Sequence, residues 1–337
     1  MALNAGAIRF NTDSMQMEIW DGNQWTGILA TSAELETGGD TAILGRIGND
    51  SVNTDKVDKV NMSTTGDGVD YADLTVSRQG QNGVHGSRTL AVFSGGYNPS
   101  TYNTNTDYVT IASGGDATAG GALTVARQGQ GACASNQTRG LHIGGYQGPA
   151  HADVLVNTID YITFSEKSAA VDFGDLVNKF ERSGSFASAT RAIHCGGKDP
   201  SNTSTHIDYV EISTLGNTAD FGTLSEQRAL NDSGSNAVRG IICGDGYSGT
   251  NTVTYVTIAT LGNDLDFGDL TTTSEGRKAA ASKTRIISCG GRVSPTPAGS
   301  DTIDYAQIMT TGNFLDFGNL SATSFTGGGT TNSHGGL

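Results

Sequence analysis

The chain has 337 residues, and its 48 glycines, 5 prolines and 16% charged residues favour many short strands joined by tight turns over helices. Its net charge of −14, with only 20 Lys and Arg residues, excludes a basic surface for nucleic acid. No basic region followed by an apolar run opens the chain, and no stretch approaches the roughly 18 apolar residues of a membrane span. We therefore expect no signal peptide and no membrane insertion.

Residues 6–28, GAIRFNTDSMQMEIWDGNQWTGI, alternate apolar and polar side chains around two turn signals, NTDS and DG. This pattern predicts a small β meander, within a module of residues 1–36, that contains both tryptophans of the chain. An isolated hairpin is marginal in water, so we expect a partner to cover it. Phe10, Trp20 and Trp25 are the candidate docking residues.

The same segment resembles a short module of the form G-x-I-R-F/Y-N-T-D-x-x-x-x-E-x-W/Y-x-G-x-x-W, common near the ends of bacteriophage tail-fibre and virion structural proteins. The matching residues, in order, are Gly6, Ile8, Arg9, Phe10, Asn11, Thr12, Asp13, Glu18, Trp20, Gly22 and Trp25. The resemblance implies a virion component, assembled in the host cytoplasm. Its implied partners are other virion proteins of the tail or of the head–tail junction.

From residue 42 onwards one unit is repeated six times, each with an anchor residue followed 16 positions later by a leucine. The anchors are Asp58, Asp107, Asp160, Asp208, Thr254 and Asp304, and the leucines are Leu74, Leu123, Leu176, Leu224, Leu270 and Leu320. An apolar run that ends in glycine precedes each anchor, and the units begin near 42, 91, 141, 192, 240 and 286. Alternation and turn signals predict four strands per unit, and four-stranded units of about 50 residues are typical of propeller blades.

The repeats predict an all-β domain over residues 37–337, a six-bladed β-propeller of four-stranded blades. The order apolar run, Gly-Gly, variable loop, Tyr, aromatic residue, Leu and Arg resembles the kelch repeat. The residues that carry the resemblance are the double glycines at 95–96, 144–145, 196–197 and 290–291, the aromatics Tyr71, Phe173, Phe221, Phe267 and Phe317, and the arginines Arg78, Arg127, Arg228 and Arg277. The chain departs from kelch repeats in having no Trp within the units.

The first unit lacks the strand that precedes the glycine-ending strand in the other units, whereas the last unit continues past Leu320. We expect residues 326–337 to pair beside 42–45. Such pairing joins the first blade to the last and removes the exposed sheet edges of a partial ring.

One carboxylate and one arginine recur in successive units, 30 to 32 residues apart. The pairs are Asp58/Arg88, Asp107/Arg139, Asp160/Arg191 and Asp208/Arg239. Because the planar guanidinium holds a carboxylate and loop carbonyls together, we expect structural ion pairs within the blades. A functional use of these charges is the alternative.

The sequence contains no signature of an enzyme, a cofactor or a metal site. The acidic pairs of the DFGD segments, Asp70/Asp73, Asp172/Asp175 and Asp266/Asp269, lack a calcium-loop pattern, so we interpret them as turn caps, with a shared Ca²⁺ as the alternative. The six histidines form no H-x-x-x-H pair. The cysteines Cys195, Cys243 and Cys289 occupy equivalent places and are interpreted as buried thiols.

The loops between each glycine-ending strand and its anchor differ in length and hold all five prolines. Equivalent loops emerge on one face of a propeller. The candidate ligand residues there are Tyr97, Tyr102, Tyr146, His151, Lys198, Tyr247 and Arg292. Aromatic side chains in a polar, adaptable setting are typical of protein or glycan recognition, and the alternative is that these loops vary for lack of constraint.

Two functions follow from these patterns. The first is a tail-associated structural adaptor or scaffold that docks through residues 1–36 and presents the propeller. The second is a host-receptor or carbohydrate-binding protein that uses the loop face. The absence of heptad repeats, which form the trimeric stalks of many receptor binders, favours the first.

Overall fold

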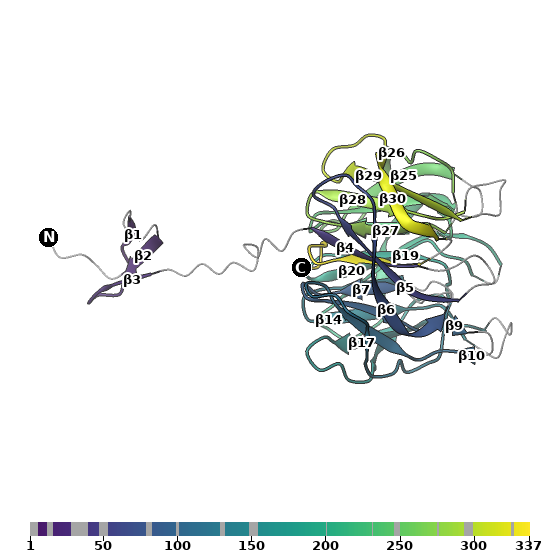
Figure 1. Ribbon diagram of the computed structural model, residues 1–337, viewed down its shortest axis with the longest axis horizontal. Coiled ribbons are helices and arrows are strands. Elements are labelled where there is room, and N and C mark those ends of the chain that lie inside the picture. The colour runs from purple at the N-terminus through teal and green to yellow at the C-terminus, as the bar shows by residue number, and fades with distance from the viewer. Residues whose placement is uncertain are drawn as a thin grey trace. The chain divides into compact units, whose positions relative to one another are not determined.

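The chain divides into two compact units, residues 1–38 and 39–337. The computed structural model describes residues 6–11, 16–27, 40–46, 53–78, 83–98, 101–128, 132–147, 154–199, 201–230, 232–245, 250–274, 276–292, 299–324 and 327–337. These ranges contain antiparallel strands and no helix (Figure 1). Accordingly, none of them supplies a helix that is long and apolar enough to cross a membrane.

The smaller unit contains a three-stranded antiparallel sheet of β1 (Ile8–Asn11), β2 (Gln16–Trp20) and β3 (Trp25–Gly27), in that order. Asp21 shapes the turn between β2 and β3, because its Oδ1 accepts hydrogen bonds from the amides of Asn23 (2.7 Å) and Gln24 (2.8 Å). The alternating apolar and polar residues thus form the β meander that the sequence predicts.

The larger unit contains six four-stranded antiparallel sheets, here numbered I to VI. In strand order, sheet I is β31 (Gly329–Thr331), β4 (Thr41–Gly45), β5 (Thr54–Asn61) and β6 (Val69–Arg78). Sheet II is β7 (Val84–Gly86), β8 (Leu90–Ser94), β11 (Thr106–Thr110) and β12 (Thr118–Ala119). Sheet III is β13 (Ala132–Ser135), β14 (Arg139–Ile143), β17 (Thr158–Thr163) and β18 (Val171–Asp175).

Sheet IV is β19 (Gly184–Ala187), β20 (Arg191–Cys195), β21 (Ser204–Glu211) and β22 (Ala219–Arg228). Sheet V is β23 (Asp232–Ser235), β24 (Arg239–Asp245), β25 (Thr250–Thr257) and β26 (Leu265–Asp269). Sheet VI is β27 (Lys278–Ala281), β28 (Arg285–Cys289), β29 (Ser300–Gln307) and β30 (Leu315–Ser324). The predicted all-β class with four strands per repeat is confirmed.

The end of the chain supplies the strand that the first repeat lacks. β31 pairs antiparallel with β4, with Gly329 opposite Leu44, Thr330 opposite Ile43 and Thr331 opposite Ala42. This pairing is the one expected between the C-terminal segment and residues 42–45. Beyond β31 the chain continues across the neighbouring sheets, where the amide of Gly335 donates to the carbonyl of Ser235 (2.9 Å).

The first strands of the six sheets lie against one another. β7, β13, β19, β23, β27 and β31 are in contact in that order, and β31 is also in contact with β7. Residues of all six strands line a cavity of about 50 Å³, which has room for one or two water molecules.

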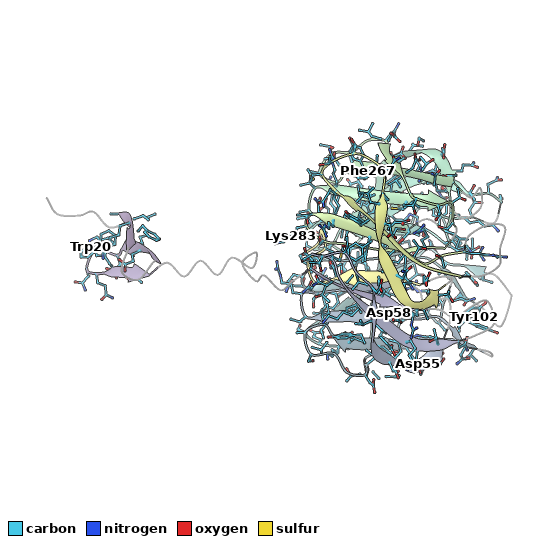
Figure 2. All side chains as sticks on the ribbon, turned by 45° about the horizontal axis from the view of Figure 1, so that its top comes forward. Trp20, Asp55, Asp58, Tyr102, Phe267 and Lys283 are labelled. Carbon is cyan, nitrogen blue, oxygen red and sulfur yellow. The ribbon has the colours of Figure 1, made fainter. Side chains whose placement is uncertain are left out.

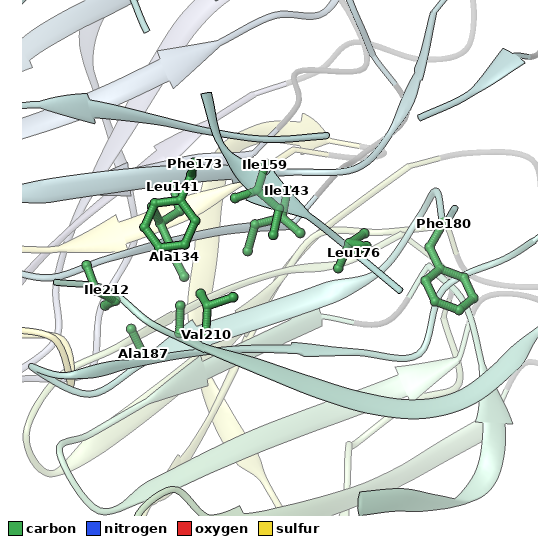
Figure 3. Packing of buried hydrophobic residues seen from close by; sticks show 11 residues of the cluster. Ala134, Leu141, Ile143, Ile159, Phe173, Leu176, Phe180, Ala187, Val210 and Ile212 are labelled. Carbon is green, nitrogen blue, oxygen red and sulfur yellow. The ribbon is translucent and has the colours of Figure 1, made fainter. Parts of the chain in front are cut away.

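Apolar side chains fill the space between successive sheets. Between sheets III and IV, Leu141, Ile159 and Phe173 pack with Val210 and Ile212 (Figure 3). Equivalent layers lie between the other sheets. Cys195, Cys243 and Cys289 are buried in these layers as thiols, as the sequence indicates.

The repeated segment that ends in DFG forms the contact between sheets. The turns of four repeats donate a backbone hydrogen bond to the outer strand of the sheet before them: Gly216 to Phe173 (2.9 Å), Gly262 to Phe221 (2.9 Å), Gly312 to Phe267 (2.7 Å) and Gly66 to Phe317 (3.0 Å). The DFG glycine accommodates this approach, because a Cβ on Gly222 or Gly268 would overlap the facing carbonyl group. The interpretation of the acidic pairs Asp70/Asp73, Asp172/Asp175 and Asp266/Asp269 as turn caps is therefore wrong, since these residues lie in β6, β18 and β26.

The expected ion pairs within blades are also wrong, because the pairs form between sheets. Asp107 binds Arg78 (2.7 Å), Asp160 binds Arg127 (2.6 Å) and Asp304 binds Arg277 (2.7 Å). Each arginine comes from the end of the preceding repeat, and the first two pairs are wholly buried. A separation of 30 to 32 residues places an aspartate and an arginine in the same repeat of the sequence. It does not show whether their side chains meet or whether the aspartate binds an arginine of another repeat.

Three of the arginines assigned to those pairs, and Arg285 at the equivalent place, act differently. Each of these four stacks on a tyrosine of its own sheet, and its Nη1 donates to a carbonyl of the next sheet. Arg139 lies over Tyr161 and binds Ile212 O (2.9 Å), Arg191 lies over Tyr209 and binds Ile258 O (3.2 Å), Arg239 lies over Tyr255 and binds Ile308 O (3.3 Å), and Arg285 lies over Tyr305 and binds Met62 O (2.8 Å).

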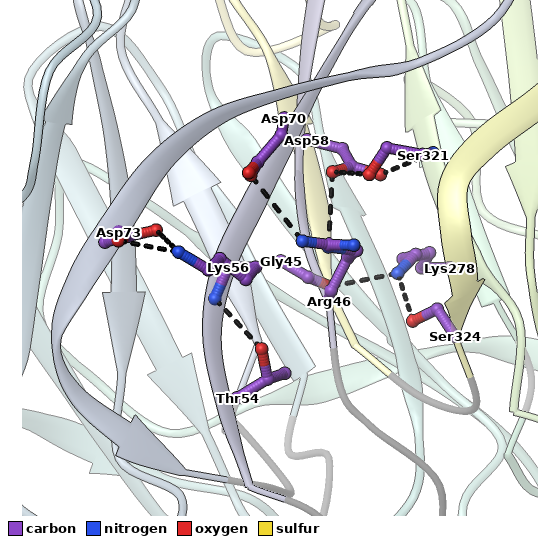
Figure 4. A network of polar contacts seen from close by, with 10 residues as sticks. All are labelled: Gly45, Arg46, Thr54, Lys56, Asp58, Asp70, Asp73, Lys278, Ser321 and Ser324. Carbon is purple, nitrogen blue, oxygen red and sulfur yellow. Dashed lines mark hydrogen bonds and ion pairs between the residues drawn. The ribbon is translucent and has the colours of Figure 1, made fainter.

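The joint between sheets VI and I uses a different set of polar groups (Figure 4). Asp58 binds Arg46 of its own sheet (3.2 Å), and Ser321 donates to the same carboxylate (2.7 Å). The buried Lys278 donates from Nζ to Gly45 O (2.9 Å) and to Ser324 Oγ (2.7 Å). Burial lowers the pKa of Lys278 to about 8.

Deleting residues 327–337 should destabilise the whole larger unit, because β4 loses its pairing with β31 and the amide of Gly45 loses its hydrogen bond to Gly328 O. We expect the melting temperature to fall by roughly 10 °C or more in thermal unfolding followed by circular dichroism. Deleting residues 1–36 is the matched control and should leave that transition within about 2 °C of the full chain. Equal effects of the two deletions would contradict this account of the joint.

Candidate functional site

Three of the seven candidate ligand residues meet in one aromatic cluster on the loop side of sheets II and III. Tyr97 and Tyr102 lie opposite each other on the hairpin of β9 (Tyr97–Asn98) and β10 (Thr101–Tyr102), with ring centroids 5.4 Å apart. Tyr146, on β15 (Tyr146–Gln147), packs edge-on against Tyr102 at 5.8 Å. All three are half-buried. Tyr102 lies at the end of the larger unit opposite the turn that carries Lys283 (Figure 2).

Backbone and amide contacts hold the cluster in place. β15 pairs with β16 (Val154–Leu155), and Tyr146 also forms an antiparallel bridge with Gln128. The Gln128 side chain donates from Nε2 to Tyr146 Oη (2.7 Å). In the hairpin, Asn98 Oδ1 accepts hydrogen bonds from the amide and hydroxyl of Thr101 (3.0 and 3.1 Å). These contacts order the rings before any ligand arrives.

The buried ion pair between sheets II and III lies directly beneath this cluster. Arg127, next to Gln128, binds Asp160 and donates from Nη1 to Thr158 O (3.0 Å) and Gly144 O (3.3 Å). Gly144 and Thr158 flank the loop that contains Tyr146. The arginine therefore joins both ends of the loop to the strand that carries Gln128.

The remaining candidate residues are not in this cluster. Lys198 forms bridges with Glu181 and Thr203 in sheet IV, and Arg292 forms a bridge with Gly299 in sheet VI. His151 and Tyr247 lie outside the described residues. The sequence analysis missed Gln128 and Asn98, because neither lies in the variable-loop aromatic pattern that selected the others, although Asn98 follows Tyr97 directly and Gln128 follows the repeated arginine.

A half-buried aromatic cluster with an amide and hydroxyl groups beside it suits a ligand with both apolar C–H faces and hydroxyl groups. Tyrosine rings offer large, rigid contact area at low entropic cost, and their hydroxyl groups can exchange hydrogen bonds with a polar ligand. The arrangement is suited to binding.

The smaller unit separates its candidate docking residues onto two faces. Trp20 and Trp25 are opposite each other on β2 and β3, with ring centroids 5.6 Å apart, and share their face with the ion pair of Arg9 and Glu18 (2.7 Å). The Arg9 guanidinium also lies 4.2 Å from the Trp25 ring centroid. By strand alternation Phe10 belongs to the other face.

That other face is apolar and exposed. Ile8 is 58% exposed and Phe10 is 52% exposed, and Ile19 lies opposite Ile8 on the neighbouring strand. Three apolar side chains are thus gathered on one face of this small sheet, where Ile8 and Phe10 are in contact with water.

The boundary between sheets III and IV has no such arginine–aspartate ion pair among the described residues. Phe180 occupies the position, four residues after the closing leucine, at which Arg78, Arg127 and Arg228 stand. It stacks on His194 with centroids 5.4 Å apart. No arginine in the described part of the chain forms an ion pair with the buried Asp208, and burial raises the pKa of this carboxyl group to about 6.

Comparison with known proteins identifies no relative of the chain, since no protein-family model matches it and no curated protein matches significantly.

Replacing Asp208 with Asn should stabilise the protein at neutral pH. The native pKa of about 6 lies above the ordinary value of 3.8, so the native state binds the proton more tightly. The resulting stability is complete below about pH 4 and is lost as the pH rises through 6. Chemical unfolding should show Asp208→Asn to be more stable than the unmodified protein at pH 8, with the difference vanishing at pH 4.

Asp160→Asn is the matched control, because the same place in sheet III faces Arg127. It should destabilise the protein at pH 8 by about 3–5 kcal/mol, since a buried guanidinium loses its carboxylate. Similar destabilisation by Asp208→Asn at pH 8 would contradict the assignment of Asp208 as an unpaired carboxyl group.

Proposed function

We propose that the larger unit is a closed, kelch-like six-bladed β-propeller and that the chain is a virion structural protein of a bacteriophage. In this proposal the propeller is a scaffold, and residues 1–36 dock it on the particle, at the tail. The ring is supported by the contacts among the first strands of all six sheets and by the pairing of β31 with β4.

The observation that carries the docking role is the exposed apolar face of the small sheet. Ile8 and Phe10 present more than half of their surface, on a unit of three short strands that has little core of its own. A partner that covers this face removes apolar area from water and stabilises the sheet at the same time. Together with the resemblance of residues 6–25 to phage virion modules, this favours an adaptor.

Docking is tested with phage particles that lack this protein and are mixed with the purified chain. The full chain should sediment with the particles, and deletion of residues 1–36 should abolish this. Phe10→Ser should weaken binding by at least about tenfold, because it removes roughly 1.4 kcal/mol or more of apolar contact. Val69→Ser, at a residue of the larger unit that is 55% exposed, is the matched control and should bind normally.

Particle binding that survives deletion of residues 1–36 would contradict the docking role. Equal losses for Phe10→Ser and Val69→Ser would also contradict it, since they would point to a general effect of exposed apolar residues.

The tyrosine cluster favours a second candidate function, recognition of a host-surface glycan. Tyr97, Tyr102 and Tyr146 form a rigid aromatic surface, and Gln128 adds an amide beside them. Such a surface fits a sugar ring, whose C–H face stacks on aromatic rings while its hydroxyl groups bind amides and phenols.

Binding to intact host cells and to immobilised host glycans tests this function. Tyr102→Ala should weaken binding by about tenfold or more, corresponding to roughly 1.4 kcal/mol, because Tyr102 contacts both other rings. Tyr102→Phe keeps the ring and should retain most of the binding. No binding of the unmodified protein to cells or glycans would reject the glycan function and leave the adaptor function standing.

A further inference from the structure

Three metal-ligating side chains from two neighbouring sheets meet beside the central cavity. His85 lies on β7 of sheet II, and Cys133 and His142 lie opposite each other on β13 and β14 of sheet III. Their ligand atoms all lie within 4.8 Å of one another. His85 and Cys133 also line the cavity.

The imidazole rings of this cluster are buried without the hydrogen bonds that buried polar groups require. His85 is 2% exposed and His142 is 0% exposed. In the described part of the chain, neither ring nitrogen of His85 has a hydrogen-bond partner, and Nδ1 of His142 has none either. Unpartnered buried nitrogens are rare, and a bound ion is one of the few things that satisfies them.

The other nitrogen of His142 is held as in metal-ligating histidines. Its Nε2 lies 2.6 Å from Ser94 Oγ, across the boundary between sheets III and II. A hydrogen bond at one ring nitrogen fixes the orientation of the ring and leaves the second nitrogen for a metal.

Local packing makes room for the rings. The rings of His85 and His142 meet edge to face, with centroids 4.5 Å apart. A Cβ on Gly140 would overlap Cδ2 and Nε2 of His85, so only glycine at this place lets the His85 ring lie against β14.

We propose that His85, Cys133 and His142 bind a transition-metal ion of borderline softness, Zn²⁺, with the fourth coordination position open toward the cavity and filled by water. Two imidazoles and one thiolate are ligands that Zn²⁺ prefers. Ligand atoms in a tetrahedral zinc site lie about 3.5 Å apart, so closing the cluster around the ion requires side-chain shifts on the order of 1 Å. The cavity provides the path of entry.

His334, the other histidine at the cavity, does not complete the site. Its Nε2 lies 2.9 Å from Gly86 O, and its Nδ1 accepts a hydrogen bond from the amide of Gly336 (3.1 Å). Both ring nitrogens are therefore used in fixing the end of the chain.

His194 supplies an internal control. It occupies in sheet IV the position that His142 has in sheet III, and its ring nitrogens also lack hydrogen-bond partners among the described residues. It stacks on Phe180, and it belongs to no group of three metal-ligating residues in that part of the chain. Comparing His142 with His194 therefore distinguishes a histidine proposed to bind metal from one that only packs against an aromatic ring.

The test is calorimetric titration of the metal-free full chain with Zn²⁺, together with optical spectra of the Co²⁺ form. We expect a single tight ion per chain and, with Co²⁺, the intense visible bands of tetrahedral coordination and a thiolate-to-cobalt charge-transfer band. Cys133→Ser should remove the charge-transfer band and weaken Zn²⁺ binding by about 100-fold or more, and His142→Phe should weaken it similarly. His194→Phe should bind as the unmodified protein does.

Circular dichroism of the metal-free variants shows whether they fold, and Cys133→Ser, which replaces one small side chain with another, is the variant least subject to misfolding. Zn²⁺ should raise the melting temperature of the unmodified protein and of His194→Phe but not that of Cys133→Ser. Absence of tight binding to the folded chain would overturn the proposal. Binding that Cys133→Ser leaves unchanged would overturn it too, because the ion would then be held elsewhere.

Discussion

The larger unit depends on the hydrogen bonds that the turns of four repeats make to the outer strand of the sheet before them. An outer strand would otherwise expose a row of unpaired amides and carbonyls, which is the usual liability of a sheet edge. In these repeats the turn covers the preceding edge, as Gly216 does on Phe173 and Gly262 on Phe221. The glycine of the DFG segment is what lets the two backbones approach. The repetition of the sequence follows from the repetition of this contact.

Buried charge reinforces the same boundaries. Arg78, Arg127 and Arg277 reach from one repeat to the aspartate of the next, where each guanidinium also binds backbone carbonyls. A buried pair of this kind contributes more to uniqueness of the arrangement than to net stability, since desolvation offsets most of the attraction. Some sheets lack this arginine–aspartate pair and have other residues in its place. At sheet IV, Phe180 stands where the arginine would be, and Asp208 has no arginine partner among the described residues. In sheet I, Arg46 of the same sheet replaces an arginine from sheet VI.

The sequence was most informative where one signal was repeated. Four strands per unit and the pairing of the C-terminal segment with residues 42–45 followed from counting units and noticing that the first was incomplete. The partners of the aspartates were predicted wrongly, because each repeat has two recurring arginines and spacing along the chain cannot show that Arg78, rather than Arg139, binds Asp107. The aromatic cluster could be predicted only in part: Tyr97, Tyr102 and Tyr146 were selected as loop residues, but their contacts depend on how sheets II and III are placed.

The histidine–cysteine cluster could not be predicted from the sequence at all. His85, Cys133 and His142 are far apart in sequence and follow no metal-site spacing, so the sequence analysis expected no metal. They come together because the first strand of one sheet lies against the first strand of the next, which is a property of the arrangement of sheets. The candidate functional features of this chain lie in the parts that break the repeat: the small N-terminal sheet, the unequal loops and this cluster.

Amide hydrogen exchange tests most directly whether the repeats are joined as described. The account predicts that peptides covering residues 214–218, 260–264 and 310–314 exchange slowly although they are turns, because their glycine amides donate to the neighbouring sheet. It also predicts that residues 329–331 are protected as strongly as β4, with which they pair. Rapid exchange of these turns and of the C-terminal strand, with slow exchange inside each sheet, would contradict it and indicate six sheets that are not joined to one another.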